Sequence, residues 1–505
     1  MKKLQLKKKR RSEKKRVQIM SKTLVPYSIK NYIDHAIAEE APNFKLKFKI
    51  EWLYYFINTI IRRQNSYSNK KLQNAPIALN AEIMKSWVSN YNEYIEWLIE
   101  KDIIMQAENY AAGKSSKKFC FSEYGISLLG RDSEIAVIDN ENLASDKIII
   151  ERSIQQSPVY KENEHLLKWF NDKLEIDFEK AKVYIQDLVF YEGEIFDLDF
   201  KKVHWQHQIS ALHHKMFYAT RNEESDFRLH TVLTSLKKIF KPFTTYDGQE
   251  IIGYDLKNSQ PFFLIFLIES LINNNNNNKI NNIIDRVYSK NVLYTFMLQK
   301  VRESLSSKGF RDEYVIFKKW VLDGRIYENM IQIIKPEKHF GSYFTYVYNE
   351  KLKCKVKQTQ DSIRGMMKGV FFTLLFCGVK TKDKYYHMFK REFPNLVGLI
   401  ELFKIENHAD FSKLLQNIES ECIIDFVTKK IAEQYPEMPL FTIHDSISTT
   451  TEFAEVLDAL MPQYVQEFTG LMPKIEKEKW KEHEYQTDYE KYVDLHPEWY
   501  CRAPS

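Results

Sequence analysis

Two aspartates far apart in the chain each stand at the end of an apolar run. Asp255 ends "IIGYD" and precedes the hydrophobic stretch "PFFLIFLI", and Asp445 ends "PLFTIHD" and precedes "SISTT". This pattern predicts that Asp255 closes a strand and that Asp445 occupies the turn of a β-hairpin. If the two strands are neighbours, both carboxylates and the Leu256 carbonyl could hold two divalent cations. A cation pair of this kind serves phosphoryl transfer, in which the attacking and leaving oxygens must both be stabilised.

The turn after Asp255 must allow a helix to begin close to that site. Asn258 and Ser259 are residue types that cap helix N-termini. Pro261 suits the first turn of a helix, where its missing N–H has no partner to lose. We therefore expect a helix that starts directly behind the strand end.

Between the two aspartates, one segment carries cations at helical spacing. In "DSIRGMMKGVFFTLLFCG", Arg364, Lys368, Phe372 and Phe376 recur every four residues, which places them along one flank of a helix. Two cations could bind a triphosphate, and an aromatic ring could stack on a base. The alternative is an ordinary amphipathic helix whose Arg and Lys face solvent.

In this order, the three segments resemble motifs A, B and C of the family A DNA polymerases and of the phage-type single-subunit RNA polymerases. The resemblance covers about residues 200–480 and implies that Asp255 and Asp445 are catalytic ligands of two Mg²⁺ ions, which Mn²⁺ can replace. "DGRIYENM" resembles the segment between motifs A and B that packs beside the nucleotide. The implied nucleotide-binding residues are Arg364, Lys368, Phe372 and Phe376 on the fingers helix, with Gln260 and Phe262 beside the sugar.

The resemblance also implies a DNA primer-template as partner. "DFRLHT" is similar to the arginine-bearing segment that contacts the duplex before motif A, and "LLQNIESECIIDF" is similar to a segment that approaches the primer-template. The nucleic-acid-binding residues implied in this way are Arg228, His230, Thr231, Gln416 and His444.

Departures from the family concern the sugar. Phe376 stands where the family usually has Tyr, so the hydroxyl that helps to monitor the sugar is missing. Phe262 occupies the ribonucleotide-excluding position if the "SQ" pairs are aligned, whereas Gln260 occupies it if the aspartates are aligned without a gap. Phe262 can equally be a core residue of its helix. We expect Phe262 to set the sugar preference more than Gln260 does.

These readings predict a DNA polymerase that uses nucleoside triphosphates, and two alternatives stay open. "HDS" and Ser259 match the RNA polymerase branch, which favours a single-subunit RNA polymerase or a primase-like enzyme. The other alternative is an inactive palm scaffold that acts as a DNA-binding replication initiator.

Upstream of this region, the pattern changes to a smaller unit. "FKIEWLYYFINTIIRRQ" and "NAEIMKSWVSNYNEYIEWLIEK" have helical apolar spacing, and short alternating runs follow around Gly113. The expected hairpin would carry Lys114, Lys117 and Lys118 at its tip. Helices followed by a basic hairpin resemble a winged helix-turn-helix, a common nucleic-acid-binding module, although many winged helices bind only protein.

The expected fold class is α+β and mostly helical. It comprises a right-hand polymerase with a palm sheet and with fingers and thumb helices, preceded by the winged helix-turn-helix-like domain. The first 17 residues hold ten Lys or Arg against one Glu, so they contribute +9 to a net charge of +6. We expect a basic, disordered tail (1–40), the winged-helix-like domain (41–135), a linker (136–160), a thumb-like helical region (161–245), and the palm and fingers (246–505).

Several functional classes are disfavoured by composition. Five cysteines without CxxC pairs argue against a disulfide framework or a zinc site. The longest apolar run is too short to span a bilayer, and the basic start lacks the apolar core of a signal peptide. We expect a cytoplasmic monomer without membrane contact, acting in replication or defence of a mobile element, plasmid or phage. Four histidines match no metal-ligand template and are expected to be structural or surface residues: His204, His207, His213 and His214.

Overall fold

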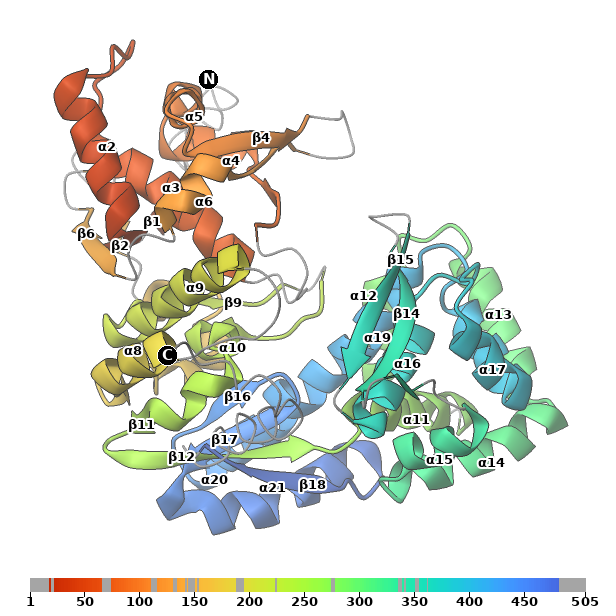
Figure 1. Ribbon diagram of the computed structural model, residues 1–505. Coiled ribbons are helices and arrows are strands. Elements are labelled where there is room, and N and C mark those ends of the chain that lie inside the picture. The colour runs from red at the N-terminus through yellow and green to blue at the C-terminus, as the bar shows by residue number, and fades with distance from the viewer. Residues whose placement is uncertain are drawn as a thin grey trace, which may run out of the picture. The chain divides into compact units, whose positions relative to one another are not determined.

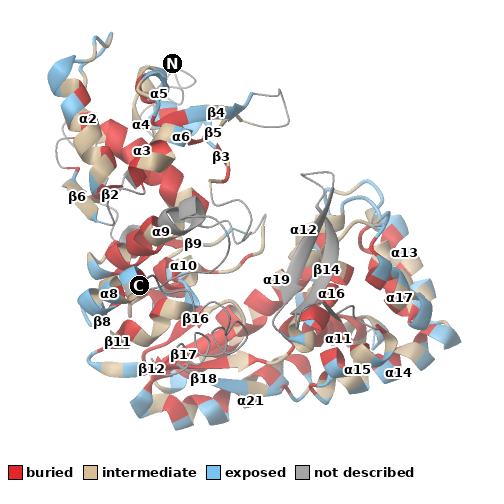
Figure 2. Ribbon diagram, in the orientation of Figure 1, coloured by how far each residue is buried: buried red, intermediate tan, exposed pale blue. Residues whose placement is uncertain are grey.

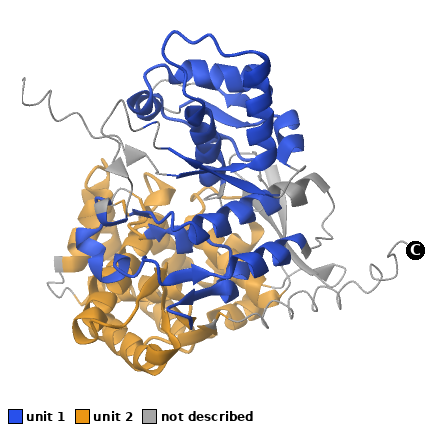
Figure 3. Cartoon of the chain, turned by 90° about the vertical axis from the view of Figure 1, so that its left-hand side faces the viewer, with its two compact units in different colours: residues 1–220, 230–249 blue, residues 221–229, 250–505 orange. Residues whose placement is uncertain are grey.

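The computed structural model describes residues 18–480 except 20–21, 66–73, 110–115, 130–133, 141–142, 144–149, 152–153, 188–194, 223–224, 274–277, 335–337, 340–341, 350–353 and 361. The chain divides into two compact units (Figure 3). Unit 1 comprises residues 1–220 and 230–249, and unit 2 comprises residues 221–229 and 250–505. The predicted boundary at 245/246 lies close to the last change of unit, at 249/250, but residues 221–229 also belong to the second unit.

The first part of unit 1 has the predicted order of helices followed by a hairpin. A three-stranded antiparallel sheet has the order β3-β5-β4. The second predicted helix is interrupted between Trp87 and Tyr91, because Val88 is extended and Ser89-Asn90 favour a turn. The elements are α3 (Ile50–Asn65), β3 (Ile77–Ala78), α4 (Ala81–Trp87), α5 (Tyr91–Glu100), β4 (Ile104–Glu108) and β5 (Lys118–Phe121).

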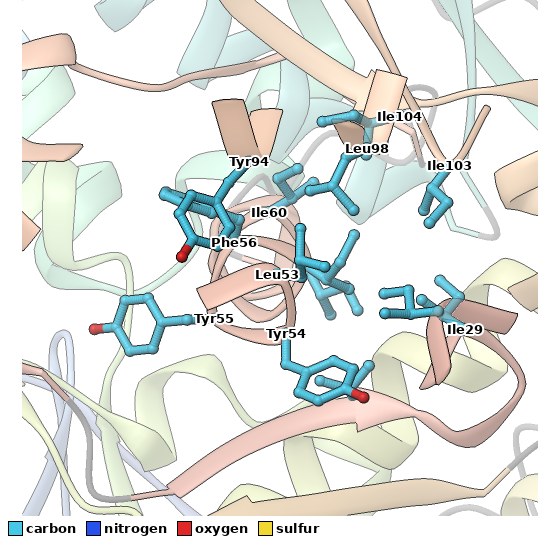
Figure 4. Close-up of a cluster of buried hydrophobic side chains, with 14 of the residues drawn as sticks. Ile29, Leu53, Tyr54, Tyr55, Phe56, Ile60, Tyr94, Leu98, Ile103 and Ile104 are labelled. Atoms are coloured by element: carbon cyan, nitrogen blue, oxygen red, sulfur yellow. The ribbon is translucent and has the colours of Figure 1, made fainter. Parts of the chain in front are cut away.

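A hydrophobic core surrounds α3 (Figure 4). Apolar residues on several sides of α3, such as Leu53, Phe56 and Ile60, are fully buried. α2 (Tyr27–Glu39) contributes Ile29 and Ile33, which lie one helical turn apart on its buried face. Because these side chains belong to the core, the tail predicted for residues 1–40 is too long.

The strand β2 (Lys22–Pro26) corrects two of the predicted segments. It pairs antiparallel with β6 (Ile135–Asp139), and its Leu24 and Val25 join the same core. Residues 22–26 are therefore not part of a tail, and residues 136–139 are not part of a linker. The apolar residues of "KTLVP" and "IAVID" are short runs, which makes them easy to miss in a sequence.

The rest of unit 1 contains the helices expected for a thumb-like region, with short strands between them. α8 (Phe178–Asp187) packs against α9 (Ile195–His213), and β8 (Leu174–Ile176) pairs with β11 (Thr244–Tyr246). His204 and His207 of α9 are buried, and the Nε2 atom of His207 lies 2.7 Å from Oδ1 of Asn58. These two histidines are structural, as expected.

Unit 2 is built on an antiparallel sheet. β12 (Gln249–Leu256) pairs with β17 (Ser446–Thr450) and β18 (Ile475–Lys479), and β17 also pairs with β16 (Phe441–Ile443). Ile252, Tyr254 and Leu256 are buried on one face of β12, where the Tyr254 hydroxyl donates to the carbonyl of Ala454, the first residue of α21 (Ala454–Thr469). Gly253 and Asp255 therefore lie on the opposite face.

Helices make up most of unit 2 (Figure 1). α11 (Ser259–Ile272) is buried from Ser259 to Ile268, and Figure 2 shows this helix and α19 among the buried elements. Among the described residues, no helix is both long and apolar enough to cross a membrane. The other elements that concern the site are α12 (Asn278–Tyr288), α14 (Lys308–Leu322), α15 (Ile326–Ile333), β14 (Ser342–Asn349), β15 (Cys354–Gln360), α16 (Ile363–Phe376), α18 (Pro394–Leu402), α19 (His408–Ser420) and a π-helical segment (Glu421–Val427).

Candidate active site

The two aspartates lie beside each other at the ends of paired strands. Asp255 pairs with Ser446, the residue after Asp445, and the Leu256 N–H donates to the Asp445 carbonyl at 3.4 Å. Asp445 and His444 form the two-residue turn between β16 and β17, with His444 in the left-handed region at φ 58°. The predicted strand end, hairpin turn and strand pairing are therefore all observed. Both aspartates are partly exposed.

A third carboxylate stands opposite Asp255 on the other side of β12. Glu476 of β18 is the direct partner of Asp255, so the two side chains share one face of the sheet. Glu476 is exposed, and sequence reasoning missed it because it lies in a charged stretch, "KIEKEKW". In the described part of the chain, no group of three or more His, Cys, Asp or Glu side chains could hold a metal ion.

The available donors fit magnesium. Mg²⁺ takes oxygen ligands, and it is commonly held by one or two carboxylates together with water and substrate phosphates. Asp255 supplies carboxylate oxygens from the end of β12 and Asp445 from the adjoining β16–β17 turn, and the backbone carbonyl of Leu256 follows Asp255 in the chain. The protein would thus supply two carboxylate ligands to such a site.

The helix behind Asp255 begins as predicted at Ser259, and Pro261 falls in its first turn. The expected capping by Asn258 is wrong. Asn258 has φ 58° and ψ 42°, and its side chain makes no capping hydrogen bond. A capping side chain reaches the first-turn amides from an extended backbone, whereas Asn258 adopts the left-handed conformation that asparagine tolerates.

The two candidate sugar-sensing residues have different environments. Phe262 is 2% exposed, and its ring packs edge-on against Phe263 at a centroid distance of 5.5 Å. Gln260 is also buried, but its Nε2 donates to Oε2 of Glu419 at 2.6 Å. The core environment of Phe262 favours Gln260 as the residue that responds to the sugar.

Four predicted nucleotide-binding residues lie along one flank of α16. Lys368 is exposed, and its Nζ lies 5.7 Å from the ring centroid of Phe372. Phe372 and Phe376 stack with nearly parallel rings, 5.5 Å apart. Arg364 forms an ion pair with Glu328 of α15 at 3.0 Å, and both side chains are more than two-fifths exposed.

The carboxyl end of α16 is held by hydrogen bonds from a lysine that follows α18. Lys404, two residues beyond that helix, is 2% exposed, and its ammonium donates to the carbonyls of Leu374 at 2.6 Å and Cys377 at 3.0 Å. Burial lowers the pKa of Lys404 to about 8. These bonds satisfy carbonyls that the end of a helix leaves without partners.

Tyr327 connects α16 electrostatically with the strand ends. Its ring lies 5.2 Å from the Arg364 guanidinium and packs against Phe371. Burial raises the pKa of the Tyr327 hydroxyl, the Arg364 guanidinium lowers it, and the Asp445 carboxylate raises it. Arg364 and Asp445 therefore act on the same side chain. Tyr327 lies in "DGRIYENM", so the segment was noted from the sequence but this residue was not.

Glu419 is a third residue that sequence reasoning missed. It is fully buried in α19, where its carboxylate accepts hydrogen bonds from Arg228 and Gln260. Burial raises the pKa of Glu419 to about 7; the Arg228 guanidinium opposes this rise and the Asp445 carboxylate adds to it. The neighbouring Gln416, which was predicted instead, is partly exposed. Glu419 follows Gln416 by three residues, a spacing that places two side chains on the same face of a helix. This spacing is the signal in the sequence that could have identified Glu419.

The other predicted nucleic-acid-binding residues belong to unit 1. His230 and Thr231 form β10, which pairs with β9 (Ala219–Thr220). Lys114 lies outside the described residues, Lys117 is exposed, and Lys118 forms an ion pair with Glu108 at 2.6 Å.

The helix before the β4–β5 hairpin has an acidic surface. α5 exposes Glu96 and Glu100, and the carboxylate of Glu93 accepts hydrogen bonds from Lys45 and Asn90. In a winged helix-turn-helix this position is that of the helix inserted in the major groove. Acidic side chains there would repel phosphates.

No protein-family model matches the chain, and no curated protein matches it. Among solved structures, the chain is similar to the "POL domain of Pol1 from M. smegmatis complex with DNA primer-template and dNTP". The two chains are 10% identical, the match covers 85% of this chain and 71% of that chain, and the TM-score is 0.25. This TM-score is below that expected of two chains with the same overall fold.

Proposed function

We propose that the chain is a template-directed nucleotidyltransferase, a DNA polymerase of the family A type that acts with two Mg²⁺ ions. The observation that carries the proposal is the placement of Asp255 and Asp445 at the ends of two paired strands. Tyr327 contacts Arg364 and lies within electrostatic reach of Asp445, which supports one shared site.

In this proposal each residue has a distinct task. Asp255, Asp445 and the Leu256 carbonyl hold the cations, which supply charge stabilisation to the attacking and leaving oxygens. Arg364 and Lys368 bind the triphosphate, because guanidinium and ammonium groups bind phosphate oxygens strongly. The stacked rings of Phe372 and Phe376 offer an apolar surface to the base.

Primer extension tests the proposal. The full-length protein would be supplied with Mg²⁺, a primed DNA or RNA template, and either dNTPs or rNTPs. We expect extension with dNTPs on the DNA template, and no extension by the Asp255→Asn variant. Failure of the wild-type protein to extend any primer with either nucleotide set would reject the proposal.

A second candidate is a single-subunit RNA polymerase or a primase-like enzyme. The buried ring of Phe262 favours it, because a ring packed in the core does not project toward a 2′-hydroxyl. Preferential extension with rNTPs, or synthesis without a primer, would select this candidate.

The proposal extends to the N-terminal part of unit 1 and to the biological setting. The helices and the β3-β5-β4 sheet of this N-terminal part support a winged-helix-like module. The acidic surface of α5 argues that contact with nucleic acid is made by the hairpin and the basic N-terminus, and not by insertion of α5 in the major groove. We place the protein, as a cytoplasmic monomer, in replication or defence of a mobile element, plasmid or phage.

A further inference from the structure

The carboxylate of Glu419 joins two side chains from distant segments of unit 2. Nε and Nη2 of Arg228 lie 2.8 and 2.5 Å from Oε1, and Nε2 of Gln260 lies 2.6 Å from Oε2. Arg228 belongs to the segment 221–229, whereas Gln260 lies in the first turn of α11, five residues after Asp255. Each oxygen of one buried carboxylate therefore serves a different part of the proposed active site.

The orientation of the Gln260 amide depends on this carboxylate. While Glu419 is ionised it can only accept hydrogen bonds, and Gln260 then turns its NH₂ group toward it, as observed. The other amide atom, Oε1, is buried and makes no hydrogen bond within the described part of the chain. Nothing else described here fixes which way the amide faces.

The Arg228 side chain is held in the same way. Its guanidinium bonds to Glu419, while its backbone N–H donates to Asp226 at 3.2 Å. Because Arg228 and Gln260 share a single acceptor group, loss of either bond changes the charge and position of the acceptor for the other.

Burial of the Glu419 carboxylate costs free energy, so stabilisation of the fold is a poor explanation for this residue. A buried ion pair is often no more stabilising than apolar residues of the same volume, because both charges must leave water. Glu419 is fully buried and also within electrostatic reach of Asp445, whose like charge adds to the cost. A carboxylate in this place is better explained by the side chains that it positions.

We propose that Glu419 is a positioning residue that couples sugar selection at Gln260 to the contact of Arg228 with the primer-template duplex. This inference rests on the proposed polymerase function. In the coupled arrangement, the two selectivities are set by one hydrogen-bonded unit and change together.

Two ratios measured with the full-length protein test this inference. The first is kcat/KM for a dNTP over that for the matching rNTP, and the second is kcat/KM for extending a matched primer end over a mismatched one. Glu419→Gln should lower both ratios by about fivefold or more, the range of ordinary coupling energies. Arg228→Ala should lower the sugar ratio too, although Arg228 does not lie on α11.

A double-mutant cycle distinguishes coupling from two independent effects. In a Glu419→Gln background, Arg228→Ala should leave the sugar ratio within about twofold, because the shared acceptor is already altered. Glu421→Gln is the matched control. Glu421 lies two residues after Glu419 and also binds an arginine, Arg286, at 3.0 Å. The control substitution should leave both ratios unchanged.

The outcomes are separable. If the wild-type protein extends no primer, the proposed function fails. If it extends primers but Glu419→Gln leaves the sugar ratio within about twofold, or Arg228→Ala affects only mismatch extension, the coupling is refuted. Thermal melting of each variant shows whether it folds. Should Glu419→Gln not fold, the Arg228→Ala sugar ratio alone decides the question.

Discussion

Asp255 and Asp445 are the residues whose substitution should matter most. Replacement of either by Asn keeps the side-chain volume but weakens its affinity for a hard cation. We expect roughly a thousandfold slower primer extension with nearly unchanged template affinity, because the cations act in the transition state. Single-turnover extension and a filter-binding assay measure the two quantities.

Glu476 supplies the control for these substitutions. It faces Asp255 across β12 and β18, but no described cluster of three acidic or metal-binding side chains includes it. Glu476→Gln should therefore change extension little. A loss as large as that of Asp255→Asn would show that three carboxylates serve the site.

Lys368 should act on the nucleotide and not on the template. Its ammonium is exposed on the same flank of α16 as Arg364. Lys368→Ala should slow incorporation by about a hundredfold, since a positioned cation is lost from the transition state. The matched control is Lys319→Ala, which removes an exposed lysine of α14. Loss of template affinity without a slower bound-state rate would contradict the assignment.

The difference between Phe262 and Glu419 shows what a sequence reveals about single residues. The places of Asp255, Asp445 and Arg364 in the fold were predictable, because a strand end, a hairpin turn and a helix flank are local patterns. Glu419 was not, because its partners Arg228 and Gln260 lie far away in the chain. The apolar neighbours of Phe262 suggested that it could be buried, but the sequence alone could not decide this, since it does not distinguish the buried apolar residues of a helix from the exposed ones.

At the scale of elements, α9 should make unit 1 sensitive to acid. Burial lowers the pKa of His204 and His207 to about 3, and neighbouring charges act in the same direction: His207 and Lys237 for His204, and Arg62 for His207. Both histidines are neutral in the folded protein, while the unfolded chain binds protons below about pH 6.5. Stability therefore falls as the pH drops below that value, by up to about 1.4 kcal/mol per pH unit for each histidine.

Thermal melting between about pH 7.5 and pH 5 tests this expectation. The double variant His204→Gln, His207→Gln should start less stable but lose less stability as the pH falls. His213→Gln is the control, because His213 is exposed. Equal slopes in the wild-type and double-variant proteins would contradict the role of burial.

Elements were predicted best where one local pattern determined them. The helix behind Asp255 and the hairpin at Asp445 were found, since Pro261 and the strand ends mark them. β2 was missed because a five-residue strand has too few residues to show a period. The helix predicted over residues 80–101 was interrupted near Asn90, where turn chemistry outweighs the apolar spacing.

At the scale of the whole molecule, the chain crosses between its two units three times. The segment 221–229 belongs to unit 2, where Arg221 makes a bidentate ion pair with Asp425 and Arg228 pairs with Glu419. A fragment of residues 246–480 would leave both carboxylates without their guanidinium partners, at a cost of about 3–5 kcal/mol for the buried Glu419 and less for the partly exposed Asp425, which keeps Lys429. The fragment 221–480 keeps both pairs.

We therefore expect the longer fragment to unfold cooperatively on heating and the shorter one to remain largely unfolded. Circular dichroism and thermal melting compare them. In the full chain, Arg221→Ala should lower stability, while Arg311→Ala on the exposed surface of α14 should not. Equal melting of the two fragments would show that the segment 221–229 is dispensable.

The different attachments of the two ends of α16 have a mechanical consequence. The carboxyl end is fastened by the buried ammonium of Lys404, whereas Arg364 at the amino end is held by a solvent-exposed ion pair with Glu328. Exposed ion pairs are weak, and a phosphate group can replace Glu328 at little cost. The Arg364 side chain can therefore exchange its carboxylate partner for a phosphate while the helix keeps its place, because Met366 and Met367 in the following residues are fully buried.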